Sequence, residues 1–326
     1  MNVSGRQWQK LRELRRFFLS AEPNRAAYWD SEETLKLYDQ TFAVRIGWRW
    51  DAVIDQVYAQ RWQPQEKVLL DWGCGSGIAA RKVLEAFPNF ESVYLADLSP
   101  RAEQYALRAA RAKFPAVSGY VGVPAGGPFC LVLSHVLGEL DTQIEEQLAS
   151  IVARASSLIW VEAGSAVLSK KLVLWRERLG RPVIAPCTHR RPCGMLAPEN
   201  QIHWCHFFTR PPAETFMSAE WAEFAHQLEI DHRTVAYSYL VLDRTAAANQ
   251  TSGFARNIGS ARVYKASAKL QLCDPNGLRD VELTKRDFPE IWRNLKKGWS
   301  PAVVKVETNG NRISGWEDFP AKNQSE

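Results

Sequence analysis

The sequence has no apolar run near the ~18 residues that a membrane-spanning helix needs, so we expect no membrane association. Its first residues, MNVSGRQWQKLRELRRFF, lack an apolar stretch followed by small residues, which excludes a secretory signal. The same segment begins rich in Arg and poor in acid, as a transit peptide does, but it continues into sequence patterned like a helix. We therefore expect a cytoplasmic protein, or one of the mitochondrial matrix if the source is eukaryotic.

The 326 residues indicate two domains, or one large domain with additions. Hydrophobic residues make up 46% of the chain, which is enough for a sizeable core. The formal net charge of +5 is modest for this length, so it agrees with a nucleic-acid partner without requiring one. We find no internal repeat. The oligomeric state is open, and we expect a monomer.

Strand and helix patterns alternate from about residue 67, which predicts an α/β fold with a doubly wound, Rossmann-like sheet. The preceding residues have helical spacing, as at Trp8, Leu11 and Leu14. The alternation stops at a cysteine-rich segment, and the Ala-, Asn-, Ser- and Gly-rich residues 245–260 have the composition of a linker. We expect an N-terminal helical region at 1–60, a nucleotide-type binding domain at 61–244 with a cysteine-rich insertion at 181–210, a small C-terminal β unit at 255–308 and a polar tail at 309–326.

A glycine-rich turn follows the first predicted strand of this sheet, in LLDWGCGSG. Glycines allow a tight turn and a close approach to a ligand, and the helix that follows offers free N–H groups. Asp97 ends the next predicted strand, twenty residues after Gly77, where a carboxylate can accept hydrogen bonds from both ribose hydroxyls. Strand, turn, helix, strand and acid in this order predict a nucleotide-type ligand; the alternative is a Rossmann turn that binds nothing.

The glycines are spaced G-x-G-x-G behind an Asp, and not G-x-G-x-x-G as in dinucleotide sites. This spacing resembles motif I of the class I methyltransferases, which bind S-adenosylmethionine. The resemblance implies that the acid of the second strand holds the ribose and that the Asp before the glycines borders the methionine end of the cofactor. The residues to which these roles pass are Asp71, Gly73, Gly75, Gly77 and Asp97.

The fourth predicted strand runs into LVLSHVLGELD, at the edge where open α/β sheets bind ligands. We assign Ser134 to the cofactor site and take His135 and Glu139 as candidate catalytic groups, with a hydrogen-bonded structural role as the alternative for His135. The segment lacks the Asn/Asp-Pro-Pro-aromatic sequence common in amino-group methyltransferases of nucleic acids. Cys130 begins the strand, the wrong end for a nucleophile. The catalytic residues therefore stay unknown.

Four cysteines of the second half form a candidate ligand set: Cys187, Cys193, Cys205 and Cys273. The first three lie within Pro-, His- and Arg-rich sequence that has little apolar area to bury, so metal binding could supply the folding free energy. Zinc and an iron–sulfur cluster both accept four cysteines. Zinc ligands usually pair as C-x₂₋₄-C, which these spacings do not match, although His189, His203 and His206 could replace a cysteine. Four unrelated thiols are the remaining alternative.

The stretches LLDWGCGSG, LVLSHVLGEL, LIWVEAGS, APCTHRRPC, HWCHF and YSYLVLDR together resemble the small-ribosomal-subunit Rsm family (Rsm twenty-two), with mitochondrial and bacterial members. The resemblance covers about residues 30–300, and the cysteine stretches are its most distinctive part. It implies a 4Fe–4S cluster on Cys187, Cys193, Cys205 and Cys273, and Thr188 stands where the family usually has Pro. It also implies a role with the small ribosomal subunit or its rRNA.

Basic residues at both ends of the chain fit an RNA partner, because cations interleaved with aromatics suit phosphates and exposed bases. The alternative is a solvated basic face with Trp292 and Trp299 in the core. The predicted contacts are Arg6, Lys10, Arg12, Arg15, Arg16, Lys285, Arg286, Arg293, Lys296 and Lys297, with His189, Arg190, Arg191 and Arg210 beside the cysteines. Three functions stay open: an rRNA methyltransferase, a non-catalytic RNA-binding assembly factor of the same fold, and a methyltransferase for a protein or small molecule.

Overall fold

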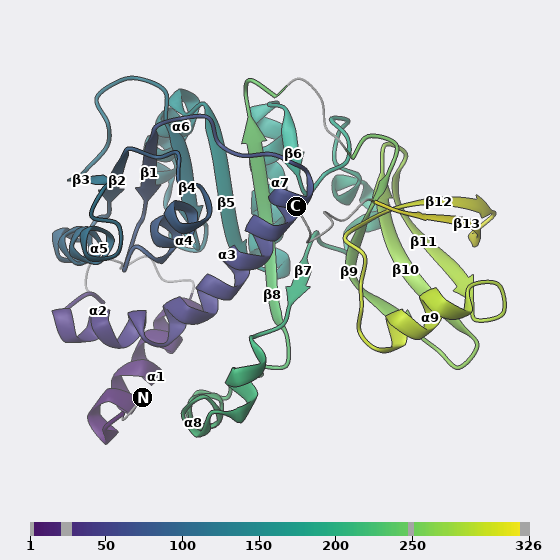
Figure 1. Ribbon diagram of the computed structural model, residues 1–326, viewed down its shortest axis with the longest axis horizontal. Coiled ribbons are helices and arrows are strands. Elements are labelled where there is room, and N and C mark those ends of the chain that lie inside the picture. The colour runs from purple at the N-terminus through teal and green to yellow at the C-terminus, as the bar shows by residue number, and fades with distance from the viewer. Residues whose placement is uncertain (1–2, 21–27, 247–250, 320–326) are drawn as a thin grey trace. The chain divides into compact units, whose positions relative to one another are not determined.

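The computed structural model describes residues 3–20, 28–246 and 251–319 (Figure 1). The chain divides into two compact units. The first unit comprises Met1–Ile54, Gln63–Glu162 and Thr209–Ala236, and the second comprises Asp55–Trp62, Ala163–Phe208 and Tyr237–Glu326. The predicted S-adenosylmethionine site lies in the first unit, and the four candidate cysteine ligands lie in the second.

Three helices precede the sheet: α1 (Gly5–Leu19), α2 (Glu32–Asp39) and α3 (Phe42–Ala59). Helix α1 begins at a capping box, in which Ser4 and Gln7 satisfy each other's backbone N–H groups. Its apolar face, with Leu11 and Leu14, packs with Phe224 of α8 (Ala219–Gln227) in the first unit. Burial of this face, and not helix propensity alone, therefore holds α1 in place.

Five parallel strands in the order β3-β2-β1-β4-β5 form the sheet of the first unit. The central strands β1, β4 and β5 are nearly continuous buried runs, as strands covered on both faces are, whereas β3 at the edge is mostly exposed. Because all five run the same way, the ends of β1, β2 and β4 bring Asp71, Asp97 and Ser134 to one edge of the sheet. The elements are β1 (Val68–Trp72), α4 (Ile78–Ala86), β2 (Ser92–Ala96), α5 (Pro100–Lys113), β3 (Ser118–Val121), β4 (Cys130–Ser134), α6 (Thr142–Arg154) and β5 (Ser157–Ala163).

In the second unit, β8 pairs with β6 and with β7. Strand β8 is antiparallel to β6, so the sheet is mixed, whereas the sequence predicted a parallel one. The predicted α/β fold itself is confirmed. Strands β6 and β7 have three residues each, too short to show a period, and the sequence did not predict them. The second unit adds α7 (Ala166–Leu179), β6 (Val183–Ala185), β7 (Phe207–Thr209) and β8 (Val235–Asp243).

The end of the chain forms a closed five-stranded barrel in the second unit. Its interior holds the alternate residues Ala268, Leu270 and Leu272, and one helix adds Trp292. The last strand occupies residues expected to be a polar tail, and the first begins within the expected linker, of which residues 247–250 lie outside the described part. The elements are β9 (Ala255–Val263), β10 (Ser267–Asp274), β11 (Gly277–Thr284), α9 (Pro289–Lys296), β12 (Val303–Asn309) and β13 (Arg312–Asp318).

Across the described residues, none of the helices combines the length and the apolar character needed to span a membrane.

Candidate functional site

The glycine turn between β1 and α4 has a backbone that only glycine accommodates without strain. Gly73, Gly75 and Gly77 have φ values of 72°, 51° and 77°. A Cβ on Gly73 would lie 2.7 Å from Cγ1 of Val136, and one on Gly77 would lie 2.9 Å from Cβ of Ala106. Conformation and packing therefore both require the predicted glycines.

Asp71 lies fully buried at the end of β1, directly before this turn. Its Oδ2 accepts a hydrogen bond of 3.0 Å from the N–H of Ala80 in α4. No described residue hydrogen-bonds to its Oδ1. The pKa of Asp71 is raised from 3.8 to about 7, chiefly by burial and to a smaller extent by neighbouring Asp97, while the Ala80 hydrogen bond opposes the rise. A buried carboxylate oxygen without a donor is costly, so this atom fits a ligand that brings one.

Asp97, after β2, closes the other side of the turn. Its Oδ2 accepts from the N–H of Gly75 and its Oδ1 from the N–H of Ser99, each at 2.9 Å. Burial raises its pKa, and these two hydrogen bonds oppose that rise. A carboxylate has about four lone-pair sites, so Asp97 keeps acceptor capacity for two hydroxyls while it is held rigidly.

Trp29 forms a third wall that the sequence did not predict. Its ring lies against the turn, since a Cβ on Gly75 would be 3.7 Å from Cζ2 of Trp29. The side chain is 3% exposed, yet its indole N–H finds no acceptor among the described residues. Nε1 of Trp29 and Oδ1 of Asp71 are thus two buried polar atoms beside the turn for which the described residues supply no hydrogen-bond partner. Nothing in the local sequence marked Trp29, because its place depends on tertiary packing.

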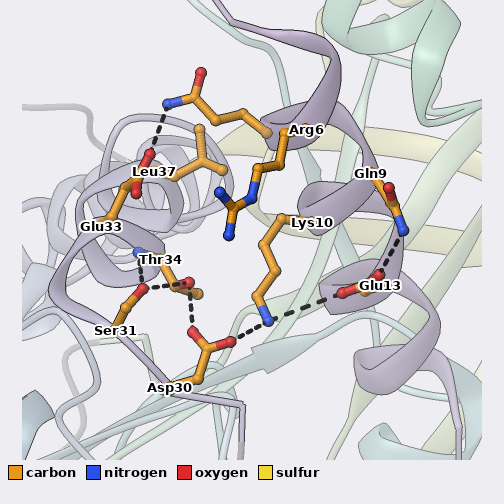
Figure 2. Close-up of a pocket in the computed structure, with 10 residues that line it drawn as sticks. Arg6, Gln9, Lys10, Glu13, Asp30, Ser31, Glu33, Thr34 and Leu37 are labelled. Carbon is orange, nitrogen blue, oxygen red and sulfur yellow. Dashed lines mark hydrogen bonds and ion pairs between the residues drawn. The ribbon is translucent and has the colours of Figure 1, made fainter.

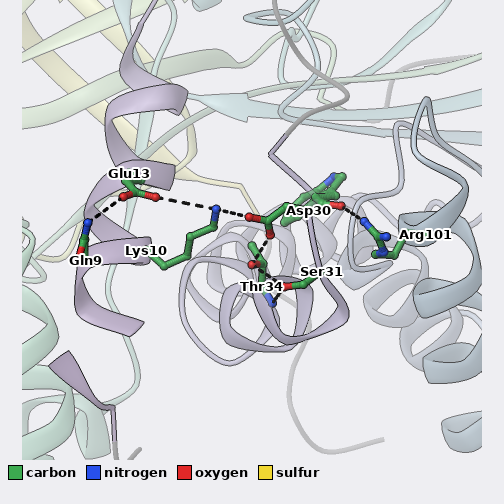
Figure 3. A network of polar contacts seen from close by, with 8 residues as sticks. Gln9, Lys10, Glu13, Asp30, Ser31, Thr34 and Arg101 are labelled. Carbon is green, nitrogen blue, oxygen red and sulfur yellow. Dashed lines mark hydrogen bonds and ion pairs between the residues drawn. The ribbon is translucent and has the colours of Figure 1, made fainter. Parts of the chain in front are cut away.

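A polar network fixes the segment that carries Trp29 (Figure 3). Arg101 of α5 donates to the carbonyl of Trp29 at 2.5 Å. The neighbouring Asp30 accepts from Lys10 of α1 and from the hydroxyl of Thr34 of α2, each at 2.6 Å. Three helices therefore hold this short segment against the turn.

A polar pocket of about 270 Å³ lies between α1 and residues 30–37 (Figure 2). Figure 2 shows that Lys10 forms ion pairs with both Asp30 and Glu13 inside this pocket. The pocket contains none of the predicted cofactor-binding residues. Its Lys10, one of the predicted RNA contacts, already neutralises acids of the same chain.

Ser134 and His135 form a hydrogen-bonded chain at the end of β4. Arg49 of α3 places Nη1 3.0 Å from Nε2 of His135, and a guanidinium can only donate, so Nε2 accepts and the proton lies on Nδ1. Nδ1 then donates to Oγ of Ser134 at 3.3 Å, which also accepts from the indole N–H of Trp50 at 3.0 Å. Both ring nitrogens of His135 are thus engaged, and the Ser134 hydroxyl hydrogen is left to donate elsewhere.

His135 also adopts a left-handed backbone, with φ of 59°, which is uncommon for a residue with a side chain. Burial, and then Arg49 and Arg45, hold its pKa well below 6.5, so the ring is neutral. Buried Glu162 of β5 fixes the loop that follows, because its Oε1 accepts from the N–H groups of Val136 and Leu137, each at 3.0 Å. Arg49 and Glu162 belong to no local sequence pattern that marks a site; only the folded chain brings them to this loop.

Glu139, the other candidate catalytic group, accepts a hydrogen bond of 3.1 Å from the hydroxyl of Tyr28. Tyr28 precedes Trp29 in the same segment, so this contact joins the loop after β4 to the wall of the glycine turn. Burial, and then Glu139, raise the pKa of Tyr28, so the phenol keeps its proton and donates it. The contact gives Glu139 a structural partner, and its catalytic role stays a prediction.

The second unit brings the four candidate cysteine ligands near one another, all as free thiols. Burial, and then Cys187, raise the pKa of Cys193 to about 11. Burial also raises the pKa values of Cys205 and Cys273, and in both cases Cys187 and Cys193 add to the rise. The thiols of Cys193, Cys205 and Cys273 therefore resist ionisation. Cys74 and Cys130 belong to the first unit.

Arg176 of α7 orders the loop between the first two of these cysteines. It is buried and donates to the carbonyls of His189 at 3.1 Å and Arg191 at 2.9 Å. Burial opposes its charge, but Cys187 and Glu177 raise its pKa. The carbonyl of Cys205 accepts from the hydroxyl of Ser238 at 2.8 Å. The loop is therefore built on hydrogen bonds to its backbone, as its low apolar content requires.

No group of three or more His, Cys, Asp or Glu side chains in residues 3–20, 28–246 and 251–319 has the arrangement to hold a single metal ion. Three histidines could replace a cysteine as a zinc ligand. Two of them contact other groups, and the third has no hydrogen-bond partner among the described residues. His206 lies 2.9 Å through Nδ1 from the carbonyl of Trp204, and Nδ1 of His203 lies 3.2 Å from the amide of Gln271. His189 is buried, and neither of its ring nitrogens has a partner among the described residues.

The predicted basic contacts differ between the two ends. At the start, Arg12 donates to the side chain of Gln227 at 2.8 Å and Arg15 to the carbonyl of Glu229 at 3.3 Å, so these cations hold α1. Near the end, Trp292 is buried in the barrel core, where stacking on a base is impossible, and Trp299 is 40% exposed. The cations Lys285 and Lys296 lie 4.5 Å and 5.3 Å from the centre of the Trp292 ring.

The chain is similar in part to several solved methyltransferases, at low identity, and no curated protein matches it. The plantazolicin methyltransferase BamL, solved with S-adenosylhomocysteine, is 12% identical, with coverage of 73% of this chain and 99% of that one and a TM-score of 0.40. TrmK of M. capricolum, also with S-adenosylhomocysteine, is 9% identical over 61% and 70%, with 0.32. A precorrin-6y C5,15-methyltransferase of Geobacter metallireducens is 15% identical over 60% and 87%, with 0.33.

One family profile matches most of the chain. It is described as mitochondrial small ribosomal subunit Rsm22, and the match runs over residues 39–300. These residues include the glycine turn, the loop after β4 and all four candidate cysteine ligands, whereas Trp29 lies outside the match. The expected resemblance is thus confirmed, and the chain belongs to the Rsm22 family of the mitochondrial small ribosomal subunit.

Proposed function

We propose that this protein binds S-adenosylmethionine at the glycine turn and acts on the RNA of the small ribosomal subunit or its precursor. The cofactor assignment rests on two buried atoms beside the turn, Oδ1 of Asp71 and Nε1 of Trp29, which find no hydrogen-bond partner in the part of the chain that the structure describes. One is an acceptor and the other a donor, so the site fits a ligand with both kinds of group. The amino-acid end of S-adenosylmethionine has an ammonium and a carboxylate.

Each side chain of the site binds a different part of the ligand. Oδ1 of Asp71 accepts from the ligand ammonium, Asp97 accepts from the ribose hydroxyls, and the indole N–H of Trp29 donates to an oxygen or nitrogen of the ligand. The hydroxyl of Ser134 keeps one hydrogen with which to contact ligand or substrate. When bound, the cofactor would supply a methyl group on a sulfonium. The residues of this chain position it and exclude water.

Membership of the Rsm22 family supports the small-subunit RNA as the partner. A non-catalytic assembly factor of the same fold is the second candidate, because both ring nitrogens of His135 are engaged and leave it no free lone pair to act as a base. The two candidates share cofactor and RNA binding and differ only in turnover. The compartment is the cytoplasm for a bacterial source and the mitochondrial matrix for a eukaryotic one.

We also propose that Cys187, Cys193, Cys205 and Cys273 bind one 4Fe–4S cluster, with zinc as the alternative. Two observations support this proposal: Cys187 and Cys193 lie close enough to Cys205 and Cys273 to raise the pKa values of those thiols, and the buried cation of Arg176 can balance negative charge on a cluster. Zinc needs four sulfurs about 2.3 Å from one ion, and hence about 3.8 Å apart. A cluster binds each cysteine through a different iron, so its sulfurs stand farther apart.

Three measurements test these assignments. Calorimetry with S-adenosylhomocysteine should show one site per chain, and no binding would contradict the cofactor assignment. Labelled S-adenosylmethionine with immature small subunits should transfer label to RNA; cofactor binding without transfer would favour the assembly factor. Anaerobically purified protein should contain about four iron and four acid-labile sulfide per chain. One zinc per chain would show that the site binds zinc and not the cluster. Protein that contains neither would indicate that the four cysteines are unrelated thiols.

A further inference from the structure

The C-terminal barrel has the connectivity of an OB-fold. If its strands β9 to β13 are numbered one to five, their order around the barrel is 1-2-3-5-4 and back to 1. Strands three and five, β11 and β13, are parallel, whereas the other neighbouring pairs are antiparallel. Helix α9 connects strands three and four and plugs the core with Trp292 and Leu295. Figure 1 shows these elements in yellow-green. OB-folds bind oligonucleotides on strands two and three and on the loops 1–2 and 4–5.

The cysteine segment of the same unit covers one half of that face. Gln271, which points outward from strand two, lies 3.2 Å through Nε2 from Nδ1 of His203. The N–H of Gly259 donates to the carbonyl of His206 at 2.9 Å. A Cβ on Gly194 would lie 2.9 Å from Cα of Gly277, so the backbone of the cysteine segment packs closely against the start of strand three there. A ligand on this barrel is therefore confined to the opposite end of strands two and three.

The loops 1–2 and 4–5 meet at that open end. The loop 1–2, residues 264–266, is tied to the end of strand three by the N–H of Lys285, which donates to the carbonyl of Ala266 at 2.8 Å. The loop 4–5, residues 310–311, is tied to strand three by the N–H of Glu282, which donates to the carbonyl of Asn311 at 2.8 Å. Hydrogen bonds thus hold both binding loops of the fold beside Lys285 and Arg286.

The side chains at this end are cationic and include one exposed aromatic. Tyr264 is 50% exposed, beside exposed Lys265, Lys285 and Arg286. None of these three cations forms an ion pair with another described residue, whereas the neighbouring Arg312 pairs with Asp287 at 2.6 Å. Unpaired cations around an aromatic ring match a phosphate backbone with accessible bases, and a stacked base needs an exposed ring such as Tyr264.

We propose that the open end of the barrel binds single-stranded RNA. Tyr264 stacks on one base, and Lys265, Lys285 and Arg286 contact phosphates. Because the cysteine segment covers the other half of the face, the site spans about four nucleotides, the lower limit for an OB-fold. Its ribosomal source rests on the proposed function, but binding of a single strand does not.

The test measures fluorescence anisotropy of a labelled single-stranded RNA with the full-length protein. Tyr264→Ala should weaken binding about tenfold and Tyr264→Phe should not, because stacking needs the ring and not the hydroxyl. Reversal of Lys265, Lys285 and Arg286 to Glu should weaken binding at least tenfold. It should also reduce the slope of log affinity against log salt by about 2, since each phosphate contact on a single strand contributes about 0.7.

The matched control reverses three exposed lysines of the first unit, Lys36, Lys67 and Lys113, and changes the net charge by the same amount. It should bind RNA nearly as the parent does, and an equal loss would overturn the site. Unchanged binding in the barrel variants, or duplex RNA bound as tightly as single strands, would also overturn it. S-adenosylhomocysteine binding is measured on every variant. Its retention shows that the protein is folded, and it separates failure of this proposal from failure of the cofactor assignment.

Discussion

Asp71→Asn should weaken cofactor binding and strengthen the folded state at the same time. The asparagine is nearly isosteric, so its amide oxygen can keep the 3.0 Å hydrogen bond from Ala80. Its NH₂ group then takes the place of Oδ1, which has no partner among the described residues, and presents a donor to the ligand ammonium. An acceptor and a negative charge are lost together, and we expect a loss of about 1.5–3 kcal/mol, the range for hydrogen bonds to charged groups.

The pH dependence of this effect follows from burial. Burial raises the pKa of Asp71 from 3.8 to about 7. Between these values the folded protein keeps a proton that the unfolded chain has released, so the free energy of unfolding falls as pH rises through this window. The full difference corresponds to an upper bound of about 4 kcal/mol. At pH 8 the Asn variant, which has no charge to bury, should therefore be more stable than the parent.

Ligand binding should have the opposite pH dependence. With a pKa of about 7, Asp71 is about 9% ionised at pH 6 and about 91% at pH 8. Affinity for S-adenosylhomocysteine should then rise up to about tenfold over this range, or about 1.4 kcal/mol. Calorimetry at both pH values measures it, and chemical denaturation measures stability. The Asn variant is the control for titration of the ligand itself. Equal pH dependence in parent and variant, or unchanged affinity in the variant, would refute the assignment of Asp71.

Two further substitutions test side chains that only the folded chain identified. Trp29→Phe keeps a six-membered aromatic ring and removes the N–H that has no partner among the described residues, so S-adenosylhomocysteine affinity should fall about fivefold by calorimetry; unchanged affinity would mean that the N–H faces no ligand. Arg176→Gln removes the donors to the carbonyls of His189 and Arg191, so limited proteolysis should cut residues 187–206 sooner and iron content should fall, with Arg178→Gln as the control on the same helix; an intact loop would contradict a positioning role.

The sequence predicted the first unit well, because its signals are local. Ser99 as N-cap and Pro100 at the first helical position mark the start of α5, and the structure begins that helix at Pro100. The glycines were predictable because their positive φ values exclude other residues. Trp29 and Glu162 were not, since neither belongs to a pattern, and each acts through a contact with residues distant in sequence.

The sequence predicted only part of the barrel, for a related reason. Ala268, Leu270 and Leu272 alternate inward in β10, and that pattern predicted a β unit. Strand β13 buries Ile313 fully and little else, so its sequence resembles a polar tail. Its parallel pairing with β11 joins Arg312 to Glu282, thirty positions apart, and no local period encodes that contact. The sequence alone therefore could not predict that the barrel closes or that its connectivity is that of an OB-fold.

The position of Cys273 links the cysteine site to the RNA site. It lies on β10, directly after Leu272, whose side chain points into the barrel, and its pKa is raised by burial and then by Cys187 and Cys193 of the covering segment. A cluster bound by all four cysteines would clamp that segment onto the barrel, since ligation free energy is folding free energy. Cys273→Ser should then lower iron content and free the covered half of the strand face. The shortest RNA that binds tightly should lengthen beyond about four nucleotides. Cys130→Ser, in the first unit, is the control. Iron loss with an unchanged minimal length would mean that the segment covers the barrel without help from the cluster.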